Sequence, residues 1–175
     1  MIMTASIIKY KEYKPKISHS VFIARGCQII GNVIIDDNSS VWYNCVIRGD
    51  VDKIVIGKNT NIQDLTMIHC SRFNGGTNIG SCVTIGHSAV IHACEIQDFA
   101  LVGMNATVMD NSVIEQYGFV AAGSLVAPNK IVRTKQLWAG VPAKYIRDIT
   151  EQEMDLIQDS WRHYRNLANA HNQNI

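Results

Sequence analysis

Three histidines have a spacing that suggests shared chemistry. His69, His87 and His92 form a His-x17-His-x4-His series in a 175-residue chain that has six histidines. Imidazole nitrogens are common metal ligands, and three of them leave a tetrahedral ion one open position for water. The alternative interpretation is three separate surface histidines. Spacing alone leaves both open, so the choice depends on the elements that carry these residues.

A six-residue repeat organises the segment that holds the three histidines. Six residues is the period of neither a helix nor a strand, and it indicates short strands joined by turns around the three sides of a prism. The sequence therefore predicts an all-β parallel β-helix over residues 17–131, with about six coils of three hexapeptides each. The repeat is carried by Ile17, Ile23, Ile29, Ile35, Val41, Ile47, Ile56, Ile62, Ile68, Ile79 and Ile85, and after a one-residue slip by Val90, Ile96, Val102, Val108, Ile114, Val120 and Val126.

Three shorter segments flank this repeat. Residues 1–16 form an N-terminal segment, 132–149 a connector, and 150–172 a C-terminal α-helix. Thr150 and Glu153 have the spacing of a capping box at the start of that helix. Its apolar stripe needs a surface, which either the prism or a neighbouring subunit offers. The stripe consists of Met154, Ile157, Trp161, Tyr164 and Ala168; the remaining histidines, His19, His163 and His171, are expected to face solvent.

The prism limits which histidines can share an ion. The eighteen residues from His69 to His87 correspond to one full coil. His87 and His92 are five residues apart, which at ~3.3 Å per residue places them on different sides or at opposite ends of one side. One chain would struggle to bring both to one ion. Two neighbouring prisms could, with His69 and His92 from one and His87 from the other, and three-fold association would build three such sites.

Composition excludes several classes of function. Lys and Arg number 16 and Asp and Glu 15, so the net charge of +1 does not favour nucleic acid as a partner. The longest uncharged stretch, residues 74–94, carries histidines, glycines and other polar residues, which argues against a membrane span. Five cysteines without a Cys-x-x-Cys pair favour a reducing compartment, and we expect a cytoplasmic protein.

Several motifs resemble the γ-class carbonic anhydrase family in order and spacing. The closing segment 137–144 also occurs in hexapeptide acyltransferases and so supports the wider superfamily. The resemblance implies a left-handed β-helix and a homotrimer with zinc at subunit interfaces, bound by His69, His87 and His92. The motifs are Ile47-Arg48-Gly49-Asp50, Asn61-Ile62-Gln63-Asp64, Ile68-His69, Thr84-Ile85-Gly86-His87, Val90-Ile91-His92 and Val102-Gly103-Met104-Asn105-Ala106.

The resemblance also implies an activity, hydration of carbon dioxide to bicarbonate by a carbonate dehydratase. Zinc with three imidazoles lowers the pKa of its water to ~7, a value known from carbonic anhydrase itself, so hydroxide is available to attack carbon dioxide. Iron or cobalt fits the same nitrogen ligands, and the sequence does not choose among the three metals.

Further roles follow only from the same resemblance. Arg48 and Asp50 would pair across a subunit boundary, and Gln63 would hydrogen-bond the metal-bound hydroxide. Asp64 would lie in the polar shell that orients Arg48 or a ligand. Asn105 would contact the small substrate.

Two departures from the family pattern concern proton transfer. Val51 stands where well-studied members have a glutamate, and the segment Cys70–Gly76 has no carboxylate where they have an acidic loop. We therefore expect slow turnover, because a proton leaving the site lacks an internal acceptor. A non-catalytic metal-binding scaffold or assembly subunit is one alternative. An acyl-CoA-dependent acyltransferase, which needs one catalytic histidine and a coenzyme A groove, is another.

Overall fold

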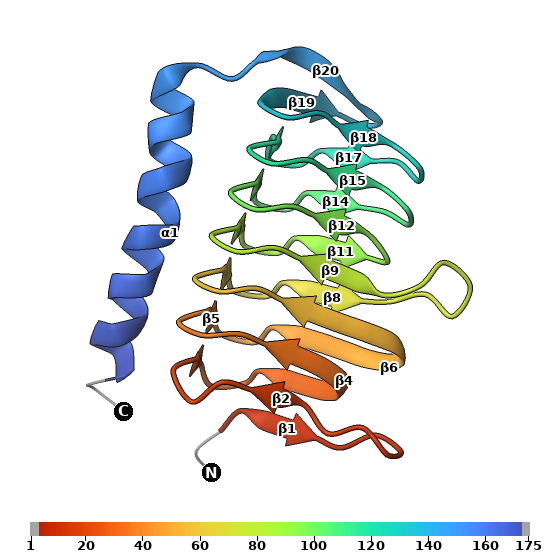
Figure 1. The fold of residues 1–175 in the computed structure, drawn as a ribbon, viewed down its shortest axis with the longest axis vertical. Helices are drawn as coiled ribbons and strands as arrows, with labels where there is room; N and C mark the ends of the chain where they lie inside the picture. Colours follow the sequence, from red (N-terminus) through yellow and green to blue (C-terminus); the bar gives the residue numbers. More distant parts are fainter. Residues whose placement is uncertain (1–3, 173–175) are drawn as a thin grey trace.

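The computed structural model describes residues 4–172, which form a parallel β-helix with one C-terminal helix (Figure 1). Three faces run along the prism. Face one comprises β1 (Ser6–Ile8), the first part of β4 (Gln28–Ile35), the first part of β6 (Val46–Ile56), β8 (Met67–His69), β11 (Val90–His92), β14 (Thr107–Val108) and β17 (Leu125–Val126).

Strands β4 and β6 turn the corner from face one to face two, so these faces are hydrogen-bonded into one sheet. Face two comprises β2 (Lys16–Ile17), the second parts of β4 and β6, β9 (Thr77–Ile79), β12 (Glu95–Ile96), β15 (Val113–Ile114) and β18 (Ile131–Val132).

Face three is a separate sheet that ends in an antiparallel hairpin. Its parallel strands are β3 (Phe22–Ile23), β5 (Ser40–Val41), β7 (Asn61–Ile62), β10 (Thr84–Ile85), β13 (Leu101–Val102), β16 (Phe119–Val120) and β19 (Gln136–Gly140), and β20 (Ala143–Asp148) closes the hairpin.

The interior of the prism is a stack of aliphatic side chains, as the repeat predicts. Apart from Val90, the isoleucines and valines of the repeat from Ile29 to Val126 are almost fully buried, and small residues such as Cys27, Ser39 and Cys45 lie beside them. All five cysteines are buried and unpaired. Many corners need a positive φ, which asparagine tolerates better than most residues; Asn44 (φ 60°) and Asn105 (φ 57°) are examples.

The predicted position of the one-residue slip is wrong. Ile91 is fully buried, whereas Val90 is 38% exposed, so the interior position is Ile91. The next interior residue is Ile96, five positions later, and the coil is therefore shortened between these two residues. Two adjacent aliphatic residues fit the repeat equally well by sequence, and only the strand register separates them.

The sheets extend beyond the segment 17–131. Strand β1 pairs in parallel with β4, which adds part of the N-terminal segment to face one. At the other end, Leu137 and Trp138 of β19 pair with β16, so strand occupies much of the expected connector. The longer, irregular hairpin of β19 and β20 explains why the six-residue repeat is lost there.

Helix α1 (Glu151–Asn172) runs back along the prism against face three, contacting β3, β5, β7 and β10 (Figure 1). Its first turn contains the predicted capping box: Thr150 N–H donates to Glu153 (2.8 Å) and Glu153 N–H donates to Thr150 Oγ1 (3.2 Å). Within residues 4–172, this helix is too polar to cross a lipid bilayer, and there is no other helix.

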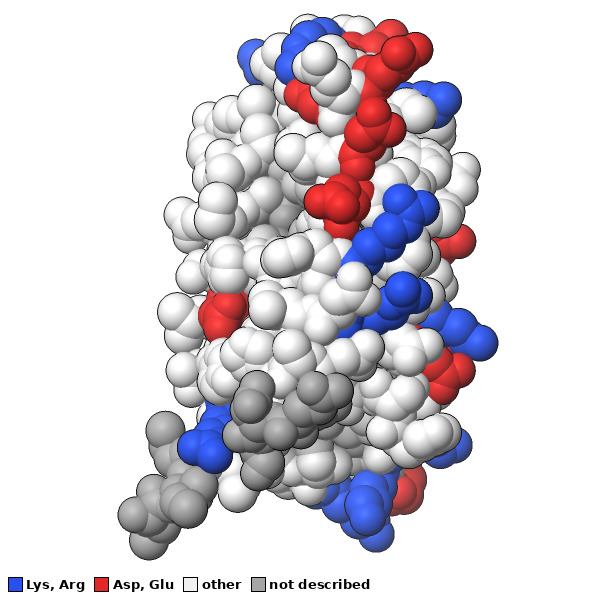
Figure 2. Space-filling model, turned by 90° about the vertical axis from the view of Figure 1, so that its left-hand side faces the viewer, with Lys and Arg blue, Asp and Glu red and all other residues white. Residues whose placement is uncertain are grey.

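The outer surface of α1 changes charge along its length. Acidic side chains occupy the upper half in Figure 2, and the arginines lie below them. The acidic first turn places negative charge at the positive end of the helix dipole, which favours the helix. The guanidinium carbons of Arg162 and Arg165 lie 5.0 and 5.5 Å from the centre of the Trp161 ring.

His171 does not face solvent as expected. It packs edge-on against Phe22 and Trp42, and its Nδ1 lies 3.1 Å from Tyr43 Oη. The last turn of α1 is thereby joined to the first coils. His19 and His163 are exposed, in agreement with the prediction.

Candidate metal centre

The corner between face one and face two, here called the His69 corner, collects polar side chains from successive coils. Arg48 of β6, His69 of β8 and His92 of β11 are in register, His69 and His92 as the last residues of their strands and Arg48 just before β6 turns the corner. A parallel β-helix places in-register residues directly above one another, so one polar residue per coil builds a row.

The two histidines of this row face one another. His69 Nδ1 lies 3.2 Å from His92 Nε2. The outer nitrogens are both held by carboxylates, because Asp50 Oδ1 is 2.9 Å from His69 Nε2 and Asp110 Oδ1 is 2.5 Å from His92 Nδ1. A carboxylate bound to one imidazole nitrogen keeps the proton there and leaves a lone pair on the other nitrogen. The two lone pairs point toward each other.

Such a pair fits a cation. Two nitrogens that each lie ~2.0–2.1 Å from a tetrahedral ion are about 3.3–3.4 Å apart, close to the distance between these histidines. Two facing lone pairs repel unless a proton or a metal ion lies between them. The donor set and its geometry are therefore suited to a metal that prefers nitrogen ligands.

Cys70 and Asp50 lie near His69, and their ligand atoms are within 4.8 Å of one another. The Cys70 thiol is buried and contacts the backbone of Asp52 through both N–H and C=O. Burial raises the pKa of this thiol and so disfavours the thiolate, the form that binds a metal ion. His92 is the better partner for His69.

His87 is not brought to the other two histidines within the chain. It lies in the turn between β10 and β11, at the corner between face three and face one, here called the His87 corner. Its Nδ1 is 2.8 Å from Asp64 Oδ2. The expectation that one coil separates His69 from His87 is wrong, because the in-register partner of His69 is His92, 23 residues on. The loop after β8 lengthens this coil.

Gln63, Asp64 and Asn105 also lie at the His87 corner. Gln63 is 5% exposed, and its amide donates to Asn61 Oδ1 at 3.1 Å. Asp64 accepts from the backbone N–H of Tyr43 as well as contacting His87. Asn105 is exposed, and its backbone N–H donates to the His87 carbonyl at 2.7 Å. The predicted site residues thus form two groups, at the two edges of face one.

Arg48 and Asp50 form an ion pair within the chain. Partial burial raises the pKa of Asp50, but hydrogen bonds with His69 and Arg48 outweigh it, so the pKa is lowered. Asp50 therefore stays ionised at neutral pH and keeps the outer nitrogen of His69 protonated.

Asp110 and Asn74 are site residues that the sequence reasoning missed. Asp110 contacts His92, and its other carboxylate oxygen accepts a hydrogen bond from Asn74 Nδ2 at 2.9 Å. A partial signal was present, because Asp110 follows His92 by 18 residues, the usual coil length. The coil is one residue shorter here, since Ile91 is in register with Val108, so Asp110 lies one position beyond the residue directly above His92. Asn74 belongs to the loop between β8 and β9, which projects from the prism in Figure 1.

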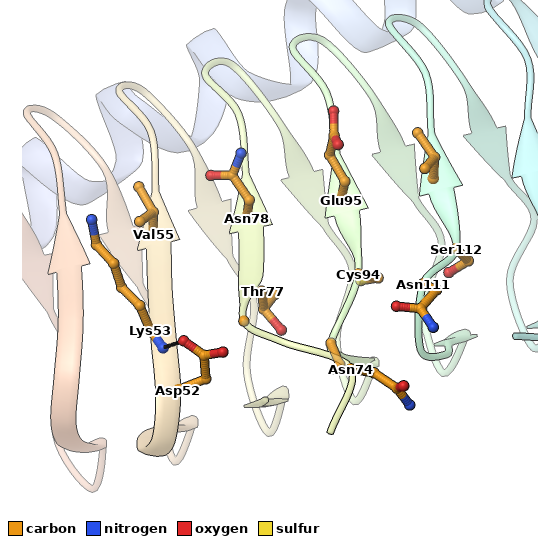
Figure 3. A pocket seen from close by; sticks show the side chains of 13 residues that line it. Asp52, Lys53, Val55, Asn74, Thr77, Asn78, Cys94, Glu95, Asn111 and Ser112 are labelled. Carbon is orange, nitrogen blue, oxygen red and sulfur yellow. Dashed lines mark hydrogen bonds between the residues drawn. The ribbon is translucent and has the colours of Figure 1, made fainter. Parts of the chain in front are cut away.

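A shallow groove of about 490 Å³ adjoins this corner on face two. Figure 3 shows Lys53, Asn78 and Glu95 along its strands, and Asn74 and Asn111 near the turns at one end. These side chains mix both charges with amides and point to no single class of ligand.

Comparisons with known proteins agree with this fold. The model of the bacterial transferase hexapeptide family (six repeats) matches residues 14–49. "Gamma carbonic anhydrase 2, mitochondrial" from Arabidopsis thaliana is 46% identical over 162 residues, covering 90% of this chain and 58% of that protein. The chain thus spans somewhat over half the length of this plant relative.

Two further relatives match over nearly their whole length. A "probable carbonic anhydrase" from Methanocaldococcus jannaschii is 48% identical, covering 87% of this chain and 95% of that protein. The crystal structure of a hexapeptide transferase family protein from Anaplasma phagocytophilum is 45% identical and superposes with a TM-score of 0.91, covering 94% of this chain and 97% of that one.

Proposed function

The chain belongs to the γ-carbonic anhydrase family, and from this premise we propose that it is a metal-dependent enzyme that hydrates carbon dioxide to bicarbonate. The observation that carries the proposal is the histidine pair of the His69 corner. Its facing nitrogens are 3.2 Å apart, and each outer nitrogen is held by a carboxylate.

We propose zinc as the metal, with iron or cobalt as the other candidates for these ligands. His69 and His92 would hold it together with His87 of a neighbouring subunit. When bound, the ion supplies a water activated for addition to carbon dioxide at neutral pH.

We propose a homotrimer because the candidate ligands lie at separate edges of one prism. His69 and His92 lie at one edge of face one and His87 at the other. A single prism is rigid and packed, so these edges cannot meet within one chain. In a closed three-fold ring each His69 corner would meet the His87 corner of the next subunit, giving three complete sites.

The remaining polar residues would prepare the site for substrate. Asn61 holds the amide of Gln63, so that its Oε1 can accept a hydrogen bond from the activated water. Asp64 would orient His87 through the contact at 2.8 Å, and Asp50 would orient His69 while Arg48 balances its charge. Asn105, exposed at the His87 corner, would contact the substrate.

Proton release is the expected weakness of this enzyme. Val51 is 48% exposed and cannot accept a proton, and residues 70–76 contain no carboxylate. The carboxylates of Asp50 and Asp110 are already engaged by the histidines. We therefore propose slow turnover that depends on external base. The unpaired, buried cysteines suit a reducing compartment, and we propose the cytoplasm.

The missing proton acceptors also favour a second candidate function, a metal-binding scaffold without turnover. Loss of proton acceptors removes catalysis and leaves the ligand set intact. The Anaplasma relative is described as a hexapeptide transferase family protein, which matches the third possibility, an acyl-CoA-dependent acyltransferase. Such an enzyme does not require two carboxylate-bound histidines that face one another.

One experiment separates the three functions. Freshly purified protein is analysed for metal content, and carbon dioxide hydration is followed by stopped flow. Metal with hydration supports the enzyme, and metal without hydration at any buffer concentration supports the scaffold. Protein that contains no metal and shows no hydration overturns both the enzyme and the scaffold and leaves acyl transfer as the remaining candidate.

A further inference from the structure

We infer that Asp110 is a positioning residue that fixes the tautomer of His92 and ties the loop between β8 and β9 to the histidine pair. The inference rests on the proposed function, because it treats His92 as a metal ligand. Asp110 lies in the turn after β14, one coil beyond His92. Its two carboxylate oxygens have different partners, His92 Nδ1 at 2.5 Å and Asn74 Nδ2 at 2.9 Å.

The contact with His92 selects one tautomer. The two carboxylate oxygens of Asp110 accept hydrogen bonds from His92 and Asn74, and an aspartate that is partly open to solvent is ionised at neutral pH. An ionised carboxylate can only accept, so the proton of a neutral His92 must lie on Nδ1. The lone pair then lies on Nε2, the atom that faces His69.

The contact with Asn74 extends this control to the loop. The loop is closed on itself, since Ser71 and Gly75 exchange backbone hydrogen bonds of 2.9 and 3.2 Å. The hydroxyl of Ser71 also accepts from the N–H groups of Phe73 and Asn74. The Asn74 side chain joins this compact turn to the next coil through Asp110 (Figure 3 shows Asn74 at the end of the groove).

Asp110 differs from Asp50, which serves the other histidine. Asp50 also pairs with the cation of Arg48, whereas the second partner of Asp110 is a neutral amide. No lysine or arginine is hydrogen-bonded to Asp110, so its negative charge acts mainly on His92. The side chains of His92 and Asp110 are 29% and 17% exposed, so solvent screens this contact only in part.

The test compares Asp110→Asn with Asp98→Asn. Asp98 is a matched control, because it also lies in a turn of the prism and accepts a backbone hydrogen bond, from Ser81, but contacts no histidine. The first readout is the tautomer of His92 in metal-free protein, measured by nitrogen NMR. We expect Nδ1–H in the parent and in Asp98→Asn, and a mixture or the Nε2–H form in Asp110→Asn.

The second readout is zinc affinity in competition with a chelator. Loss of a carboxylate that orients a ligating histidine typically weakens metal affinity about 10–100-fold, and we expect that loss for Asp110→Asn alone. Asp110→Glu keeps the charge and should restore the Nδ1–H tautomer, which separates the effect of the charge from a folding defect.

The third readout concerns the loop. Asn74→Ala should increase proteolytic cleavage of residues 71–76 several-fold and leave the His92 tautomer unchanged. If Asp110→Asn keeps the parental tautomer and zinc affinity, the inference is overturned. A parent protein that binds no zinc overturns the proposed function instead, and the NMR measurement on metal-free protein still decides the role of Asp110.

Discussion

The two edges of face one allow the ligand assignment to be tested with mixed subunits. His87→Ala and His69→Ala each remove one ligand, so homogeneous trimers of either variant should contain no complete site. In a mixed trimer, a boundary is complete where a chain that keeps His69 and His92 meets a neighbour that keeps His87. With equal amounts and random exchange, each condition holds for half of the chains, and about one quarter of the sites should recover.

The assay measures the zinc content of the protein after passage over a chelating resin that removes zinc from sites with only two ligands. Chain exchange is proven separately by capturing two different affinity tags in sequence. We expect near-background zinc for each variant alone and about one quarter of the parental content for the mixture.

A matched mixture provides the control. His92→Ala combined with His69→Ala should give no recovery, because both of these ligands come from the same chain and no chain in the mixture has both. Absence of recovery in the first mixture despite proven exchange, or equal recovery in the control, would refute the assignment of His87 to the neighbouring subunit.

Three further predictions concern turnover and stability. Hydration at saturating carbon dioxide should be slow in dilute buffer and rise with imidazole concentration, and Val51→Glu should raise the low-buffer rate; a parent rate that stopped-flow assays find indifferent to buffer would contradict the missing proton acceptor. The hydrogen bond from Arg147, together with the backbone of Thr150, lowers the pKa of Glu153 from 4.5 to about 2. The ionised Glu153 therefore contributes fully to the free energy of unfolding above pH 4.5, and this contribution is lost as the pH falls through 2. Glu153→Gln should destabilise the protein at pH 7 more than at pH 2, as measured by urea unfolding. Ile91→Ala should lower the free energy of unfolding by about 2–5 kcal/mol, whereas Val90→Ala should cost less because that side chain is 38% exposed, and equal effects would mean that the interior position is misassigned.

The fold could be predicted because the same aliphatic interior position recurs in every hexapeptide of the prism. A prism one side chain wide accepts only aliphatic and small residues, so nearly every coil repeats the same constraint in the sequence. The capping box of α1 could be predicted for a similar local reason, since Thr150 and Glu153 are three residues apart and each accepts a hydrogen bond from the backbone N–H of the other. The position of the one-residue slip could not be predicted, because Val90 and Ile91 are both aliphatic and the sequence does not show which of them points inward.

The candidate site was predictable only in part, because coil length varies. Counting by eighteen pairs His69 with His87, whereas the structure pairs it with His92 through the longer coil that contains the loop. The same count leads from His92 to Asp110, which lies one position beyond the in-register residue because that coil is one residue short. His171 was misjudged because its partners, Trp42 and Tyr43, are more than a hundred residues away, and a helical stripe does not show which coil each turn will meet.

The returning helix also changes how the chain can fold. A solenoid held together only by contacts between successive coils can unravel from either end, and its first coils can form while later ones are still being synthesised. Here the contact between Tyr43 and His171 joins positions 128 residues apart. Closing so large a loop late in folding should make loss of the first coils cooperative with loss of the last helical turn. We therefore expect the chain to unfold as a single cooperative unit and not as a linear array of independent repeats.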